Sequence, residues 1–314
     1  PMFTTAVLRK GVSPHSYIQN TCQYLKARWT PGNSPPGTVV MPIMFHSITD
    51  GRPQFHDQMT VDAFTELMHA LVDAGFQAIN MQQVVAFLEE NASIPQRSVV
   101  LIVDDRKREE YFLRHFKPYY DQYGWPVVNA WISAADTSDT LWAENVQLEE
   151  AGWVDHQAHG VVHNITATNK VDDEFLRTEL YGSIEAIQDH FGKRPLAYIW
   201  PGGNFTFHAI EIARQAGYKL GFTVNPRGPL MFNWVPLADE FDLTRPTYLA
   251  EGPMLDPLMV LPRYWSTNAV KQIPKVIQIS EEAAAAAAQN RSQELEYYDI
   301  VCKDVTGPIS IVNP

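Results

Sequence analysis

The chain has 314 residues, 45% of them hydrophobic and 19% charged, which suits a folded globular protein and excludes disorder as its main state. Its 36 acidic and 24 basic residues give a formal net charge of −12. Without a basic run, such a chain is a poor candidate for binding nucleic acid through phosphates. No apolar stretch approaches the roughly 20 residues of a membrane-spanning helix. The length allows one large domain or two small ones.

The N-terminal region is predicted to be an extension that ends in a linker. A helix is expected within residues 17–29, and residues 30–37 are so rich in Pro and Gly that they break helices and strands. Cys22 and Cys302, the only cysteines, exclude a thiolate zinc site and leave one long-range disulfide open. Because the chain starts at Pro1 without a signal segment, we expect a processed or trimmed form, and its sequence does not indicate the cellular compartment.

Short apolar runs and helix-like stretches alternate after residue 37. The predicted strands cover residues 39–45, 76–79, 98–103, 127–132, 153–155, 196–200 and 219–224. The predicted helices cover residues 61–74, 82–90, 108–123, 144–151, 172–191 and 207–216. Repeated strand–helix units predict a parallel sheet covered by helices, and about seven units favour a barrel. The pattern loosens after residue 225, and six alanines after Glu281-Glu282 predict a short helix.

Ionisable residues follow several of the predicted strands directly. His46 comes after the first strand, Asp104 and Asp105 after the third, and His159 and His163 after the fifth. In parallel α/β folds the carboxyl ends of the strands meet at one face, where reactive residues gather. We therefore expect these side chains to share a site.

The chemistry of these residues indicates a metal centre. His159 and His163 are four positions apart, a spacing that places both imidazoles on one face of a helix or helical turn, where they can reach one ion. Two adjacent carboxylates at a buried strand end repel each other unless a cation or a proton-transfer role compensates. Asp105 would complete the ligand set, leaving Asp104 as a general base on metal-bound water. Two surface histidines and a solvated loop start are the alternative interpretation.

These segments, in this order, resemble the NodB-homology polysaccharide deacetylases of carbohydrate esterase family 4. The family's first motif, TFDDG, reads IVDDR at residues 102–106, and its second, H-[ST]-x-x-H, reads HGVVH at residues 159–163. Its third motif reads WPGGN at residues 200–204, and residues 41–48 look like the opening of the branch that acts on poly-N-acetylglucosamine. The resemblance implies a distorted (β/α)7-type barrel at residues 38–262, with extensions at residues 1–37 and 263–314.

Site roles carry over from the family position by position. The resemblance implies that Asp105, His159 and His163 bind a divalent metal, usually zinc, although cobalt or nickel often serves. It implies Asp104 as base, His46 as acid and the Gly202 N–H as an oxyanion donor. Arg245, in a late L-x-R segment, would orient the base carboxylate. The predicted substrate contacts are Arg106, Trp200, Pro201, Gly203, Asn204 and Trp131.

Two departures from the family pattern bear on substrate choice. Arg106 replaces the Gly after the aspartates, and Gly202 replaces the usual aromatic residue. We expect a metal-dependent hydrolase that removes N-acetyl groups from an N-acetylglucosamine-type saccharide, exported if it follows the family. The alternatives are another C–N hydrolase, acting on a formyl group or a cyclic amide, and a non-catalytic carbohydrate-binding relative. Whether the chain forms a homo-oligomer stays open.

Overall fold

A parallel β-sheet forms the centre of the protein in the computed structural model, which describes residues 2–241 and 249–309. Its strand order is β10-β9-β8-β7-β6-β2-β12, and β5 pairs with the start of β6. The bounds are β2 (Val39–Phe45), β5 (Gln77–Ala78), β6 (Arg97–Asp104), β7 (Val127–Trp131), β8 (Val154–Ala158), β9 (Ala197–Ile199), β10 (Leu220–Phe222) and β12 (Tyr264–Trp265). A parallel bridge between Phe222 and Leu261 links the two ends of the sheet. The predicted seven-stranded α/β barrel is confirmed.

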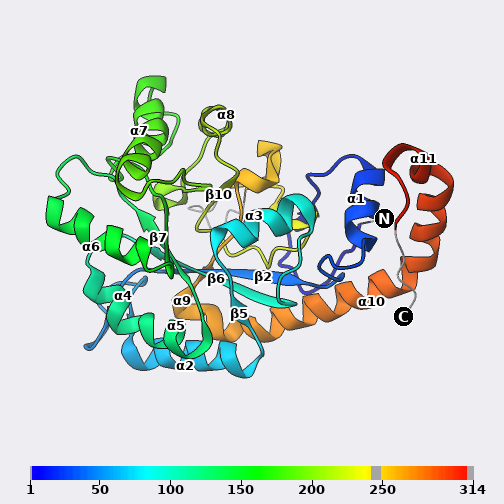
Figure 1. Ribbon diagram of the computed structural model, residues 1–314, viewed down its shortest axis with the longest axis horizontal. Helices are drawn as coiled ribbons and strands as arrows, with labels where there is room; N and C mark the ends of the chain where they lie inside the picture. The colour runs from blue at the N-terminus through cyan, green and yellow to red at the C-terminus, as the bar shows by residue number, and fades with distance from the viewer. Residues whose placement is uncertain (1, 242–248, 310–314) are drawn as a thin grey trace.

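The strands were predictable because both faces of the sheet are covered. Every residue of β2 is buried, and so is β6 from Ser98 onward. Strands buried on both faces carry continuous apolar runs instead of an alternating pattern. Helices lie around the sheet in Figure 1. They are α2 (Val61–Asp73), α3 (Met81–Glu90), α4 (Glu109–His115), α5 (Lys117–Tyr123), α6 (Asp139–Glu150), α7 (Asp173–Phe191) and α8 (Phe207–Ala216).

The single helix predicted at residues 108–123 is wrong, because the structure divides it into α4 and α5. The division falls at Phe116, and Pro118 stands in the first turn of α5. Proline lacks the N–H that a continuing helix would need, but it is tolerated in a first turn.

Several short elements escaped the sequence prediction. β1 (Val12–His15) pairs antiparallel with β11 (Val235–Ala238), and β3 (Ile48–Thr49) pairs with β4 (Met59–Thr60). Five further segments are short helical turns: Pro201–Gly203, Gly252–Met254, Pro257–Met259, Val270–Gln272 and the π-helical Tyr298–Cys302. The strand β12 lies just beyond the predicted boundary at residue 262 and pairs with β2. That boundary remains a prediction.

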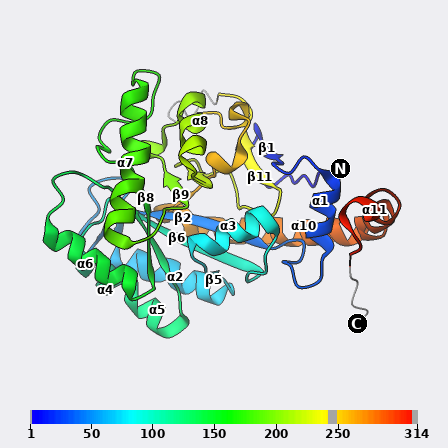
Figure 2. The same ribbon diagram turned by 45° about the horizontal axis from the view of Figure 1, so that its top comes forward.

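The two extensions pack together at one end of the molecule. Figures 1 and 2 both show α1 (Thr21–Trp29) beside α11 (Lys303–Thr306), which follows the long helix α10 (Ile273–Tyr297). A disulfide joins Cys22 to Cys302, which answers the question that the sequence left open. The alanine run belongs to the 25-residue α10, which follows the short helix α9 (Ser266–Ala269), so the short tail helix that we predicted is in fact much longer.

Among the described helices, none is both long enough and apolar enough to span a membrane.

Candidate metal centre and active site

Three strands deliver the central side chains to one face of the barrel. Asp104 is the last residue of β6, and Asp105 follows it. His159 comes directly after β8, and His46 directly after β2. Because these strands are parallel neighbours or near neighbours, their carboxyl ends lie close together, as the sequence predicted.

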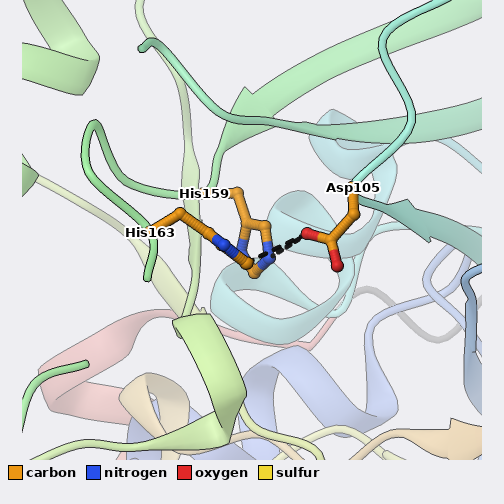
Figure 3. Close-up of side chains that lie close together, drawn as sticks. All are labelled: Asp105, His159 and His163. Carbon is orange, nitrogen blue, oxygen red and sulfur yellow. Dashed lines mark ion pairs between the residues drawn. The ribbon is translucent and has the colours of Figure 1, made fainter. Parts of the chain in front are cut away.

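Asp105, His159 and His163 form a compact cluster of candidate metal ligands (Figure 3). The Asp105 Oδ1 atom lies 3.0 Å from His163 Nε2 and 3.4 Å from His159 Nε2. One ligand atom from each residue lies within 4.8 Å of the others. The predicted grouping of one carboxylate and two imidazoles is therefore present in the structure.

The residues present fit a divalent cation. Asp105 Oδ1 is buried, yet it accepts no hydrogen bond from the described residues. His159 Nδ1 donates to the carbonyl of Ile199 at 2.7 Å, which fixes the tautomer and leaves Nε2 with a free lone pair facing Asp105. Two imidazole nitrogens and a carboxylate that leave further coordination positions open are a catalytic ligand set of the zinc type.

The charges of the cluster depend on one another. Burial raises the pKa of Asp105, but the favourable interactions of the neighbouring His159 and His163 with its carboxylate outweigh burial and hold that pKa far below its usual range. The contact with Asp105 raises the pKa of His163, although partial burial opposes the shift. The Asp105 carboxyl is therefore ionised at neutral pH, as a metal ligand must be.

The two histidines do not lie on a helix, contrary to the expectation from their spacing. The segment after β8 is a loop, in which Gly160 has a φ of +82° and His163 a φ of +61°. Both values fall in the left-handed region, which an α-helix cannot use. The turn, instead of a helix face, brings the imidazoles together, with ring centroids 4.8 Å apart.

Asp104 is buried and paired with an arginine that the sequence analysis missed. Arg263, 0% exposed, donates from its two terminal nitrogens to both Asp104 oxygens, at 2.7 and 2.9 Å. Burial raises the pKa of Asp104, but Arg263 and the nearby histidines outweigh burial and lower it. Arg245, which the resemblance nominated for this role, lies outside the described residues. Residues 261–263, LPR, are a second L-x-R segment and were the available signal.

His46 faces both aspartates. Its Nε2 atom lies 3.9 Å from Asp104 Oδ2 and 4.0 Å from Asp105 Oδ2. Its ring stacks on Trp265 at a 12° interplanar angle, and its backbone carbonyl accepts a hydrogen bond from the Tyr111 hydroxyl. Burial lowers the pKa of His46, although the two carboxylates oppose that shift. The His46 imidazole is thus held in place from two sides.

The WPGGN segment forms a tight turn at the end of β9. Gly202 has a φ of +59°, and a Cβ at Gly203, whose φ is +70°, would collide with the side chain of Val224. Asn204 donates from its side chain to the Gly202 carbonyl at 3.2 Å. Both glycines are therefore required by the backbone of this turn.

Three predicted substrate contacts occupy different environments. Trp131 and Trp200 are 0% and 1% exposed, and the Trp200 indole N–H donates to the Met259 carbonyl, so both rings pack in the core. Arg106 is half-buried, and its Nε atom is buried without a hydrogen-bond acceptor among the described residues. Of these three, Arg106 and Trp131 each keep a buried donor without a partner among the described residues, the Arg106 Nε and the Trp131 indole N–H.

The fold and the site together define a class of protein, an α/β barrel with a carboxylate–histidine cluster at the carboxyl ends of its strands. Residues 91–221 match the sequence profile of the family described as Polysaccharide deacetylase, a stretch that includes Asp104, Asp105, His159, His163 and Gly202. This stretch of the chain is thus similar to the polysaccharide deacetylases.

Solved structures of deacetylases have the same fold. The Streptococcus pyogenes deacetylase PplD, in complex with acetate, is 17% identical with a TM-score of 0.59, over 76% of this chain and 98% of that one. IcaB from Ammonifex degensii is 16% identical with a TM-score of 0.56, over 78% and 97%. A de-N-acetylase from Aggregatibacter actinomycetemcomitans is 17% identical with a TM-score of 0.54, over 72% and 94%. No curated protein matches the sequence significantly.

Proposed function

We propose that this protein is a metal-dependent deacetylase that removes N-acetyl groups from an N-acetylglucosamine-type polysaccharide or oligosaccharide. The observation that carries the proposal is the Asp105–His159–His163 cluster beside the buried Asp104–Arg263 pair. The similar structures support it, since they include a de-N-acetylase and a deacetylase in complex with acetate. In this proposal the barrel domain spans residues 38–262 and the extensions flank it.

Asp105, His159 and His163 would hold the metal, with zinc first and cobalt or nickel as substitutes. When bound, such an ion lowers the pKa of a water molecule and polarises the scissile carbonyl. The protein's part is to keep Asp105 ionised and to keep Nε2 of His159 free of a proton, which the Ile199 carbonyl ensures by accepting from Nδ1.

Proton transfer falls to Asp104 and His46. Asp104 accepts a proton from the attacking water, and Arg263 keeps the carboxylate ionised and oriented for that task. His46 donates a proton from Nε2 to the departing nitrogen, since an imidazole can give up a proton near neutral pH. The backbone N–H of Gly202, in the turn at the end of β9, would bind the oxyanion. The products are acetate and a free amine.

Substrate selection in this proposal rests on the residues around the turn and on Arg106. Pro201, Gly203 and Asn204 shape the wall beside the Gly202 N–H. The buried, unused Nε donor of Arg106 can bind an oxygen of the substrate, and its charge favours an anionic group. That charge also supports the second candidate, another C–N hydrolase with a small anionic substrate.

The test measures acetate release from a panel of N-acetylglucosamine polymers and oligomers. The protein is stripped of metal and reloaded with zinc or cobalt, and Asp104→Asn is run beside it. We expect metal-dependent release that falls about 100- to 10,000-fold in the variant, which should still bind the metal. Asp189→Asn, at an exposed site on α7, is the matched control and should keep full activity.

Three results contradict parts of the proposal. Normal turnover in Asp104→Asn would show that Asp104 is not the general base. Acetate release by the metal-stripped protein without added metal would show that the reaction does not require a metal ion. Metal binding with no release from any panel member moves the assignment to another C–N substrate or to a carbohydrate-binding role.

A further inference from the structure

The loop that carries His163 is held by a buried carboxylate outside the ligand set. Three consecutive backbone N–H groups converge on Glu179 of α7: Val161 donates at 3.1 Å, Val162 at 2.6 Å and His163 at 3.4 Å. Glu179 is only 3% exposed, and no Lys, Arg or His among the described residues forms an ion pair with it. Backbone donors are therefore the main compensation for burying this carboxylate.

The Glu179 carboxylate occupies the space that a side chain at residue 160 would need. A Cβ at residue 160 would collide with Glu179 Oε2, and the φ of Gly160 is +82°. Any side chain at this position would push the carboxylate away from the N–H groups of the next three residues. The glycine that replaces the family's Ser or Thr in the second motif is thus what lets the Glu179 carboxylate reach the loop.

The conformation that Glu179 stabilises sets the position of His163. His163 has a φ of +61°, which is costly for a residue with a side chain and persists only where the surroundings enforce it. The strained residue is also the one whose Nε2 lies 3.0 Å from Asp105. In the described part of the chain, the Glu179 carboxylate is the acceptor that holds the three N–H groups on one side of the loop.

We infer that Glu179 is a positioning residue, which presets His163 for metal binding by anchoring the backbone of residues 161–163. The inference rests on the proposed function in one respect, the assignment of Asp105, His159 and His163 as metal ligands. It adds a residue that lies on a different helix and 16 positions along the chain from His163.

Glu179→Gln tests this inference, because it keeps the size of the side chain and removes its charge. One amide N–H₂ would then face backbone donors. We expect zinc and cobalt to bind to the stripped protein about 10- to 100-fold more weakly, the range typical of residues that orient metal ligands. Calorimetric titration measures this affinity. Glu185→Gln, at an exposed site on the same helix, should bind metal as the unmodified protein does.

Nuclear magnetic resonance of the stripped protein gives a readout that needs neither metal nor turnover. Glu179→Gln should shift the backbone amide signals of Val161, Val162 and His163, because charge-assisted hydrogen bonds are lost there. Glu185→Gln should leave those signals in place. Should Glu179→Gln fail to fold, Glu179→Asp keeps the charge but is one methylene short, and we expect intermediate metal affinity.

The outcomes separate this inference from the proposed function. If the unmodified protein binds no metal, the ligand assignment fails, while the amide signals still test the anchoring. If the unmodified protein binds metal and Glu179→Gln binds it equally well, the inference about Glu179 is overturned. Unchanged amide signals in Glu179→Gln overturn it as well.

Discussion

Arg263 shows how one buried side chain can hold the carboxylate that we propose as the catalytic base, Asp104. It donates to both oxygens of Asp104 and, from Nε, to the Thr223 carbonyl at 2.7 Å, so that it ties β6 to the segment after β10. Neither charged group is exposed to water. A buried pair of this kind is costly to break, because the remaining partner stays charged and desolvated.

Replacing Arg263 by Met should therefore destabilise the fold strongly. We expect the free energy of unfolding to fall by about 3–5 kcal/mol, since Asp104 is left buried without its partner. Urea unfolding at neutral pH measures the change. Arg177→Met, at an exposed site on α7, should cost much less. Equal losses in the two variants would show that the Arg263–Asp104 pair does not stabilise the fold.

The residues of the candidate site that belong to local sequence motifs could be predicted, and the distant residues that support them could not. Asp104, Asp105, His159 and His163 each follow a buried strand, and parallel strands bring their carboxyl ends together. Arg263 escaped because it lies 159 positions from Asp104, and an L-x-R pattern occurs twice in the region. The loop conformation at His163 was not predicted, because a spacing of four residues does not determine the backbone φ angle. The contact between Glu179 and this loop could not be predicted either, because it depends on how α7 packs beside the loop.

At the scale of elements, the longer strands and the helices between them were the predictable part. β2 has the predicted bounds, and Gly124, Gly192 and Gly217 cap their helices in left-handed conformations. β1, β11 and β12 are short and gain their identity only from distant partners, so no local periodicity marks them. The formation of these strands therefore depends on tertiary pairing and could not be predicted from the local sequence pattern.

Helix α10 approaches the linker closely through its alanines. A Cβ at Gly37 would lie 2.6 Å from the Ser280 carbonyl and 2.8 Å from the Ala284 Cβ, while the Ser280 hydroxyl donates to the Gly37 carbonyl at 2.6 Å. Gly37 also has a φ of +91°. Small residues on both sides are thus a packing requirement, besides the helix propensity that the sequence analysis noted.

Gly37→Ala should destabilise the protein more than the matched change Gly32→Ala does. Gly32 has a similar φ of +90° but no neighbour within 4 Å, so that it reports the backbone cost alone. We expect an additional loss of about 1–3 kcal/mol at Gly37 from overpacking against α10. Chemical unfolding of both variants gives the difference. No difference between them would mean that the linker moves aside freely.

His115 on α4 should make stability depend on pH. Burial lowers its pKa, and Arg114 lowers it further, while Asp50 opposes the shift. Because the folded state binds the proton less readily than the unfolded chain, stability is complete above the unfolded value of 6.5 and falls as the pH drops below it.

His115→Phe removes this titration in a site lined by the rings of Phe64 and Tyr111. Between pH 7 and 5 the variant should lose less stability than the unmodified protein, by at most about 1.4 kcal/mol per pH unit. Unfolding free energies measured across that range provide the comparison. His69→Gln, at an exposed site on α2, should keep the original slope; a parallel slope for His115→Phe would contradict the prediction.

At the scale of the whole molecule, the two extensions act as one unit. Besides the disulfide, Arg28 and Trp29 of α1 both donate to Glu294 of α10, at 3.0 and 2.7 Å. The inner face of α10 contributes Val276 and Ile279 to the same core cluster as β2. The N-terminal extension is thereby attached to the C-terminal helix, in addition to its direct pairing with the barrel region through β1 and β11.

Cys22→Ser should lower stability by about 2–5 kcal/mol, because the disulfide closes a long loop and restricts the unfolded chain. Thermal unfolding with and without a reducing agent measures the effect. Reduction should destabilise the unmodified protein to the level of the variant and leave the variant unchanged. Cys302→Ser should behave like Cys22→Ser, and the double variant should be no worse. If a reducing agent has no effect on the unmodified protein, the disulfide is absent or does not contribute to stability.

The disulfide also changes what a protease can release. Cys22 and Cys302 are 280 positions apart, so nearly the whole chain lies inside a covalent ring with short tails. A single cut anywhere in that ring opens it but separates nothing, and the two pieces would run as one species on a gel until they are reduced. Wherever the disulfide persists, one cut in a surface loop within this ring therefore leaves both pieces covalently joined.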